Sequence, residues 1–129
     1  MVKPDGVKRR LVGEILGRFE KRGFRLVALK MVDVSLDLAE RHYEAHKGKG
    51  FYDELIEFIT SGPVVPMVLE AKDAVALGRQ MIGSLYPSEA IPGTIRGDLT
   101  TDPQQNLIHG ADSPEAAARE IPLWFPELS

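Results

Sequence analysis

Short apolar runs alternate with segments of helical periodicity along this chain. From Leu11 to Phe19, apolar residues recur at helical spacing, and Lys21-Arg22-Gly23 supplies the basic last turn and the glycine that typically end a helix. We therefore expect a helix over residues 9–22. Further helices are expected over residues 35–46, 51–60 and 73–82 and from Ser113 onward.

Apolar runs without helical periodicity predict the strands. These runs lie at residues 1–3, 24–34, 64–70 and 106–109. Pro66 interrupts the third run, because proline cannot donate to a central ladder. Without the additional helices the order is βαββαβ, which predicts an α+β fold with helices packed on a sheet. Residues 86–99 show no clear period, so we expect a long loop of the kind usually kept for function.

Composition limits the classes of function. The chain has 129 residues, 43% of them hydrophobic, so we expect a single domain over residues 1–129. A net charge of −3 and a pI near 5.6 argue against a duplex-binding surface, so nucleic acid is not expected as a partner. The absence of cysteine excludes disulfides and thiolate chemistry. No apolar stretch reaches the roughly 20 residues of a membrane helix, so we expect no membrane contact and a cytoplasmic location.

His109 occupies the junction where a strand is expected to stop and a helix to begin. Gly110 follows it, and Ser113 with Pro114 forms a favourable helix start. Neutral imidazole is a nucleophile or a base near pH 7, and such a junction holds a reactive side chain rigidly yet open to a ligand. A structural or solvated histidine remains the alternative.

Glu120 lies about two helical turns beyond Ser113, so it can face back toward the turn that carries His109. A carboxylate on the second ring nitrogen would fix the imidazole tautomer and stabilise positive charge on the ring. A solvated glutamate on a helix surface is the alternative.

Arg96 stands between glycines in Pro92-Gly93-Thr94-Ile95-Arg96-Gly97-Asp98, and its guanidinium group matches the geometry of phosphate oxygens. The alternative is a surface pair between Arg96 and Asp98. Arg79 and Lys3, taken singly, are typical surface residues. If the three cations converge on His109 in this acidic chain, they form a small polyanion site, such as a nucleotide phosphate pocket.

His42 and His46 have the i, i+4 spacing of two metal ligands on one helix face. No third ligand is evident, so two ordinary helix histidines are favoured over a metal site. The Walker A and GxGxxG patterns are also absent, so any nucleotide would be held by another route.

Taken together, the motifs resemble one family in order and spacing, the nucleoside diphosphate kinases. The resemblance extends over essentially all 129 residues and rests on Lys3-Pro4-Asp5-Gly6, Ser61-Gly62-Pro63-Val64-Val65, Pro92-Gly93-Thr94-Ile95-Arg96-Gly97-Asp98 and Asn106-Leu107-Ile108-His109-Gly110-Ala111-Asp112-Ser113. It implies a ferredoxin-like fold with a four-stranded antiparallel sheet and extra helices.

The resemblance also implies transfer of a γ-phosphoryl group from a nucleoside triphosphate, such as ATP, to a nucleoside diphosphate through phospho-His109. Glu120 would hold the other ring nitrogen, and Lys3 would assist the transfer. The implied nucleotide-binding residues are Lys3, Tyr43, Phe51, Leu55, Arg79, Arg96 and Asn106. In this scheme Phe51 stacks on the base with Leu55 beside it, and Tyr43 lies beneath the phosphates. Mg²⁺ would be carried by the nucleotide and not by a protein metal site.

Departures from the family pattern leave a second hypothesis open. The first strand is nearly absent, so it is expected to be truncated, while Leu85 and Ala111 stand where the family commonly has threonine and serine. The alternative is therefore a nucleotide-binding or assembly protein of the same fold with weak or no kinase activity. The family also implies a homo-oligomer, a hexamer rather than a tetramer, for which the apolar segment Leu123-Trp124-Phe125 would suit a self-contact.

Overall fold

Helix starts follow capping side chains. Ser35 Oγ accepts from Leu38 N at 3.1 Å, and Ser113 Oγ accepts from Ala116 N at 3.0 Å. Gly23 ends a helix in the left-handed conformation, with φ 106°.

The computed structural model describes residues 1–128. The elements are α1 (Pro4–Lys8), α2 (Val12–Arg22), β1 (Arg25–Leu29), α3 (Leu36–His42), the 3₁₀ turn η1 (Glu44–His46), α4 (Tyr52–Ile59), β2 (Met67–Glu70), α5 (Ala74–Ile82), α6 (Ile95–Leu99), α7 (Pro114–Trp124) and the 3₁₀ turn η2 (Pro126–Leu128).

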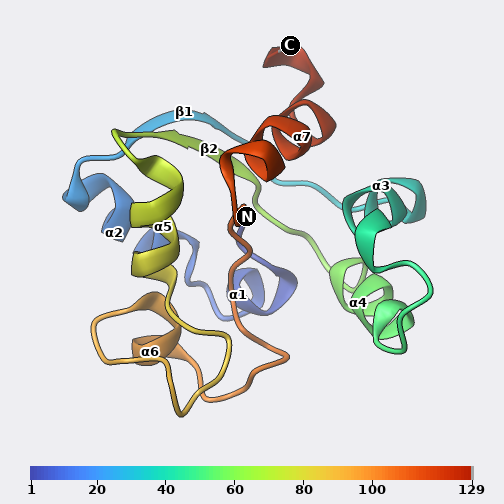
Figure 1. Ribbon diagram of the computed structural model, residues 1–129, viewed down its shortest axis with the longest axis horizontal. Coiled ribbons are helices and arrows are strands. Elements are labelled where there is room, and N and C mark those ends of the chain that lie inside the picture. The colour runs from blue at the N-terminus through green and yellow to red at the C-terminus, as the bar shows by residue number, and fades with distance from the viewer. Residues whose placement is uncertain (129) are drawn as a thin grey trace.

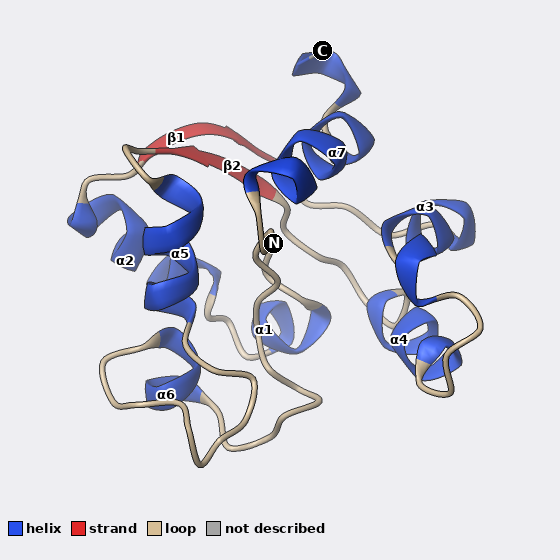
Figure 2. Ribbon diagram, viewed as in Figure 1, coloured by secondary structure: helices blue, strands red, loops and turns tan. Residues whose placement is uncertain are grey.

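β1 and β2 form an antiparallel pair, which Figure 2 shows as the two strands. The register runs from Arg25 opposite Glu70 to Leu29 opposite Met67. Single bridges continue the pairing beyond these strands, at Val32↔Val64, Val2↔Val65 and Val2↔Ile108. Val2 therefore lies between the Val65 segment and the Ile108 segment. The mixture of helices and antiparallel pairing confirms the α+β class.

The strands are shorter than the sequence predicted. Within residues 1–128 the expected first and fourth strands are present only as bridges at Val2 and Ile108. On one side α1 begins at Pro4, and on the other Leu107 adopts φ 73°, so neither segment stays extended. Pro66 cannot donate, although its carbonyl still accepts from Lys30 N at 3.3 Å.

Two short helices also correct the prediction. α1 replaces the expected turn, because Pro4 suits the first helical position. α6 lies within the expected loop 86–99, because Thr94 Oγ1 accepts from Gly97 N at 2.9 Å and caps a new helix.

The core has two hydrophobic clusters on either side of the central segments. Figure 1 shows α2 and α5 on one side of the molecule and α3 and α4 on the other, with the N-terminus between them. The first cluster consists of Val2, Ile15, Phe19, Phe24, Val65, Ile82, Ile95, Leu107 and Ile108. The second consists of Val34, Ala39, Tyr43, Ile59, Val64, Trp124 and Phe125. In residues 1–128 no helix combines the length and apolar character needed to cross a bilayer.

We expect Ile15→Ala to lower the free energy of unfolding by about 3 kcal/mol, because it leaves a cavity in the first cluster. Ile15 is 0% exposed. Urea unfolding measures the change, with Leu36→Ala as a control because Leu36 is 59% exposed. A loss below about 1 kcal/mol for Ile15→Ala would contradict its place in the core.

Candidate functional site

Lys3 and Arg96 meet at the side chain of Asn106. Lys3 Nζ donates to Asn106 Oδ1 at 2.9 Å, and Arg96 Nη2 donates to the same oxygen at 3.5 Å. Only 8% of Lys3, 7% of Arg96 and 5% of Asn106 is exposed. The fold thus holds two cations close together and largely out of water.

The pKa values of Lys3 and Arg96 show that this arrangement disfavours both positive charges. Burial, together with the charge of Arg96, lowers the pKa of Lys3 to about 8. Burial and the charge of Arg79 lower the pKa of Arg96 to about 10. Because each cation disfavours the charge on its neighbour, a bound polyanion would relieve the repulsion.

Arg96 also braces the backbone around the site. Its Nη1 donates to Gly83 O at 3.2 Å and its Nη2 to Ile108 O at 2.6 Å. The alternative of a surface pair between Arg96 and Asp98 is wrong. Asp98 instead accepts from Arg18 Nη1 and from Gly93 N, both at 2.8 Å.

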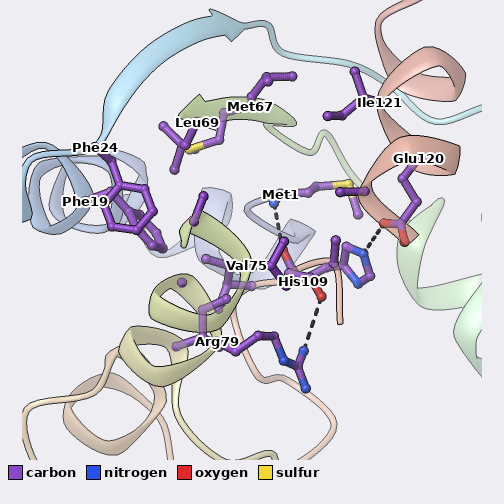
Figure 3. Close-up of a pocket in the computed structure, with 18 of the residues that line it drawn as sticks. Met1, Phe19, Phe24, Met67, Leu69, Val75, Arg79, His109, Glu120 and Ile121 are labelled. Carbon is purple, nitrogen blue, oxygen red and sulfur yellow. Dashed lines mark hydrogen bonds and ion pairs between the residues drawn. The ribbon is translucent and has the colours of Figure 1, made fainter. Parts of the chain in front are cut away.

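Arg79 approaches from α5. It is exposed, and its Nη1 donates to Gly110 O at 3.2 Å, directly after His109 (Figure 3). Cations from the N-terminal segment, α5 and α6 thus surround the segment that carries His109. Leu85 lies exposed in the connection after α5 and brings no hydroxyl group to the site.

His109 and Glu120 are in direct contact. His109 Nε2 lies 2.5 Å from Glu120 Oε1, and Glu120 projects from α7, as its helical spacing indicated. Burial lowers the pKa of His109, and the bond to Glu120 opposes that shift. Burial disfavours the ionised form of Glu120, but His109 holds the pKa of this carboxyl below its usual value.

These directions define the tautomer of His109. An ionised carboxylate only accepts hydrogen bonds, so Glu120 requires the proton of the neutral ring to sit on Nε2. Nδ1 of His109 then carries the free lone pair. Neutral His109 can therefore act as a nucleophile through Nδ1, and Glu120, at Nε2, can stabilise positive charge that develops on the ring.

His42 is a buried neighbour of His109 that the sequence did not indicate. The ring centroids lie 4.6 Å apart at an interplanar angle of 78°, and Trp124 Nε1 donates to His42 Nδ1 at 3.1 Å. Indole only donates, so His42 carries its proton on Nε2 when neutral. Burial, with His109 adding to it, lowers the pKa of His42 to about 3. The sequence signal that points toward this neighbourhood is the i, i+4 spacing of Glu120 and Trp124, which places both side chains on one face of α7.

The cluster of His42, His109 and Glu120 is the candidate metal group in residues 1–128, with ligand atoms within 4.8 Å of one another. Its hydrogen bonds do not fit a resident Mg²⁺. One nitrogen of each ring is committed, to Trp124 or to Glu120, and Mg²⁺ prefers oxygen ligands. His46 is not paired with His42, and its ring lies 5.4 Å from that of Phe51.

A row of aromatic rings leads from His109 toward the surface. His42 contacts Tyr43 at 4.7 Å between centroids, and Tyr43 lies 6.1 Å from His46, which contacts Phe51. Burial raises the pKa of Tyr43 to about 12, with the charge of Glu120 contributing. Phe51 is 47% exposed, so a planar ligand can reach its ring.

Leu55 lies one turn after Phe51 on α4, and its N–H donates to Phe51 O at 3.1 Å. Its side chain packs against the second core cluster. Leu55 therefore lies near Phe51 along the helix and is half-buried against the second core cluster.

An apolar cavity of about 180 Å³ lies on the other side of His109. Figure 3 shows Phe19, Met67 and Leu69 on its apolar side, away from Arg79. Lys3, Arg96 and Asn106 do not line it. Arg79 is the candidate cation that does line it, together with His109 and Glu120.

The comparisons with known proteins agree over the whole chain. The family model described as "Nucleoside diphosphate kinase" matches residues 1–129. A nucleoside diphosphate kinase from Carboxydothermus hydrogenoformans is 61% identical over 127 residues, covering 98% of this chain and 85% of that protein. One from Sulfolobus acidocaldarius is 56% identical over 129 residues, covering 100% of this chain and 89% of that protein.

Solved structures give the same result. The apo nucleoside diphosphate kinase of Encephalitozoon cuniculi has a TM-score of 0.93 at 44% identity, covering 96% of this chain and 84% of that one. The Halobacterium salinarum enzyme in complex with CDP has a TM-score of 0.93 at 48% identity, covering 96% and 83%. These matches confirm the resemblance and the phosphotransferase class that it implied. A histidine held by a carboxylate among buried cations is thus found in a chain that belongs to the nucleoside diphosphate kinase family.

Proposed function

We propose that this chain transfers the γ-phosphoryl group of a nucleoside triphosphate to a nucleoside diphosphate through Nδ1 of His109. The observation that carries the proposal is the contact between His109 Nε2 and Glu120, which leaves Nδ1 as the free nitrogen. The family assignment supplies the reaction class.

In the first half-reaction, the Nδ1 lone pair attacks the γ-phosphorus in line. The bond from phosphorus to the bridging oxygen breaks, and the nucleoside diphosphate leaves with that electron pair. The His109 ring becomes positively charged while its proton remains on Nε2, where the Glu120 carboxylate stabilises it. In the second half-reaction, a terminal oxygen of another diphosphate attacks the same phosphorus, and the bond to Nδ1 breaks.

Lys3, Arg79, Arg96 and Asn106 would hold the phosphates or the sugar in this proposal. An ammonium group has three N–H donors, and the contact of Lys3 with Asn106 uses one of them. Arg96 contributes chiefly charge, because carbonyl groups take most of its donors. Mg²⁺ would enter as part of the nucleotide complex, consistent with the poor fit of the histidine cluster to a resident magnesium ion.

Phe51 would stack on the base, with Leu55 beside it, and Tyr43 would lie beneath the phosphates. Every base presents a π-face, so a stacking site of this kind accepts many nucleotides, ATP among them. The related enzyme that was solved with CDP supports a nucleoside diphosphate as one of the ligands.

We also propose one domain over residues 1–129 whose Val2 and Ile108 bridges mark two further strands of a four-stranded, ferredoxin-like antiparallel sheet. A cytoplasmic homo-oligomer, a hexamer rather than a tetramer, belongs to the same proposal. Trp124 and Phe125 are buried in the chain's own core, so they do not provide the expected self-contact. Exposed apolar side chains at Leu29 and Met31 are better suited to it.

Incubation with γ-labelled ATP and Mg²⁺ should give an acid-labile, alkali-stable phosphoprotein, because the nucleophile is a ring nitrogen. His109→Ala should remain unlabelled. If the folded protein binds ADP, as a rise in melting temperature would show, but takes up no label, the alternative of a binding protein without transfer replaces the kinase.

Glu120→Gln should slow phosphorylation of His109 by about 10- to 100-fold, because the amide keeps the size of the side chain but loses the charge that stabilises the ring. Rapid-quench labelling measures this rate constant. Glu115→Gln is the matched control, since Glu115 is exposed in the first turn of the same helix. Equal rates for Glu120→Gln and the unmodified chain would exclude the electrostatic role.

The value of kcat/KM for the nucleoside triphosphate should fall as pH rises through about 8, because Lys3 loses its proton near that pH and with it the attraction for phosphate. Lys3→Met should be slower at lower pH and should lack this fall, whereas Lys8→Met, at an exposed position, should retain it. An unchanged alkaline fall in Lys3→Met would assign it to another group.

A further inference from the structure

Leu107 adopts a strained backbone conformation between Asn106 and Ile108. Its φ is 73°, and Ile108 N donates to Asn106 O at 2.8 Å, which closes a three-residue turn around it. Turns of this kind with positive φ are rare and strained for residues other than glycine. Leu107 is also 0% exposed, so the surrounding structure must hold the turn in place.

Asp5 supplies the contact that holds it. Its Oδ2 accepts from Leu107 N at 3.0 Å in a buried hydrogen bond that joins residues 102 positions apart. The neighbouring Lys3 N donates to Leu107 O at 2.8 Å. The peptide groups on both sides of the strained residue are therefore tied to the N-terminal segment.

Gly6 allows the close approach that these bonds require. A Cβ atom at this position would lie 3.0 Å from Leu107 O and 2.7 Å from Val2 Cγ1. Such contacts force a shift of the Leu107 carbonyl or of Val2. The pair Asp5-Gly6 thus fits the turn in two ways, by capturing its N–H group and by leaving space for its carbonyl.

The turn determines where the phosphate-binding groups stand. Asn106 O accepts from Arg96 Nε at 3.2 Å, and Asn106 Oδ1 accepts from Lys3 Nζ. Ile108 O accepts from Arg96 Nη2, and His109 follows immediately. A change in the backbone of Leu107 would therefore move Asn106, Arg96 and the nucleophile relative to one another.

The carboxyl group of Asp5 is buried, and one of its oxygens, Oδ1, lacks a hydrogen-bond partner within residues 1–128. Burial accordingly raises the pKa of Asp5. The backbone N–H group of Leu107 and the charge of Lys3 oppose this shift, so the contact with the turn offsets part of the cost of burying the carboxylate.

We propose that Asp5 is a positioning residue for phosphoryl transfer, which acts through the Leu107 N–H group to hold the strained turn that places Asn106 and His109. The inference rests on the proposed function, because its readout is phosphorylation of His109. It assigns no contact between Asp5 and the substrate.

The test compares rate constants for His109 phosphorylation by γ-labelled ATP and Mg²⁺ in the full chain. Asp5→Ala should reduce the rate constant about 100-fold, because misplacement of reacting groups by about an ångström has effects of that size. Asp5→Asn should remain within about threefold of the unmodified chain, because the amide oxygen can still accept from Leu107 N. Asp33→Ala, at an exposed aspartate, should have no effect.

Rescue by asparagine distinguishes positioning from a general loss of structure, and melting temperatures show whether each variant is folded. A folded Asp5→Ala that is phosphorylated at the unmodified rate overturns the proposal, as does an Asp5→Asn that is as slow as Asp5→Ala. If Asp5→Ala does not fold, Gly6→Ala decides, with Gly17→Ala as its control because no atom lies within 4 Å of a Cβ there. A slow Gly6→Ala supports the proposal, and a normal one overturns it.

The outcome is separable from that of the proposed function. If the unmodified chain takes up no phosphoryl group, the kinase proposal fails. If the unmodified chain is phosphorylated and the variants at Asp5 and Gly6 behave like it, only the positioning role fails.

Discussion

The site depends on the pairing of the N-terminal residues with the segment that carries His109. Val2 bridges Val65 on one side and Ile108 on the other, and His109 N donates to Met1 O at 2.8 Å. This pairing carries Lys3 into the interior beside Asn106. Because the pairing is buried and its backbone groups are hydrogen-bonded, it fixes the backbone of Lys3 relative to that of His109.

The second requirement is electrostatic. Lys3 and Arg96 share the oxygen of Asn106, and burial lowers the pKa of both. The charge of Arg96 adds to the shift of Lys3 and that of Arg79 to the shift of Arg96, while Asp5 opposes both shifts. Folding energy from the two apolar clusters offsets this repulsion in the free protein. Phosphate groups would remove it, so the same arrangement that is unfavourable without ligand favours a polyanion.

Local patterns in the sequence were sufficient for part of this organisation. Helical spacing placed Glu120 toward His109, and the capping residue Ser113 marked the start of α7. The strained turn at Leu107 had no such signal, because a hydrogen bond that joins residues 102 positions apart leaves no periodicity in the sequence. The spacing of Glu120 and Trp124 on α7 indicated a shared face but not the bond to His42. Strand lengths were overestimated for a related reason: apolar runs report burial, whereas pairing ends where α1 and the Leu107 turn begin.

The neutral state of His42 completes the electrostatic design. His109 gains positive charge when its Nδ1 forms a bond to phosphorus, and a second cation against its ring would oppose that step. Burial and the indole of Trp124 keep His42 neutral, although its ring lies 4.6 Å from that of His109. An uncharged neighbour therefore packs against the ring of His109, while the carboxylate of Glu120 contacts its Nε2. A histidine locked in one tautomer fills this position without competing for the proton on Nε2 of His109.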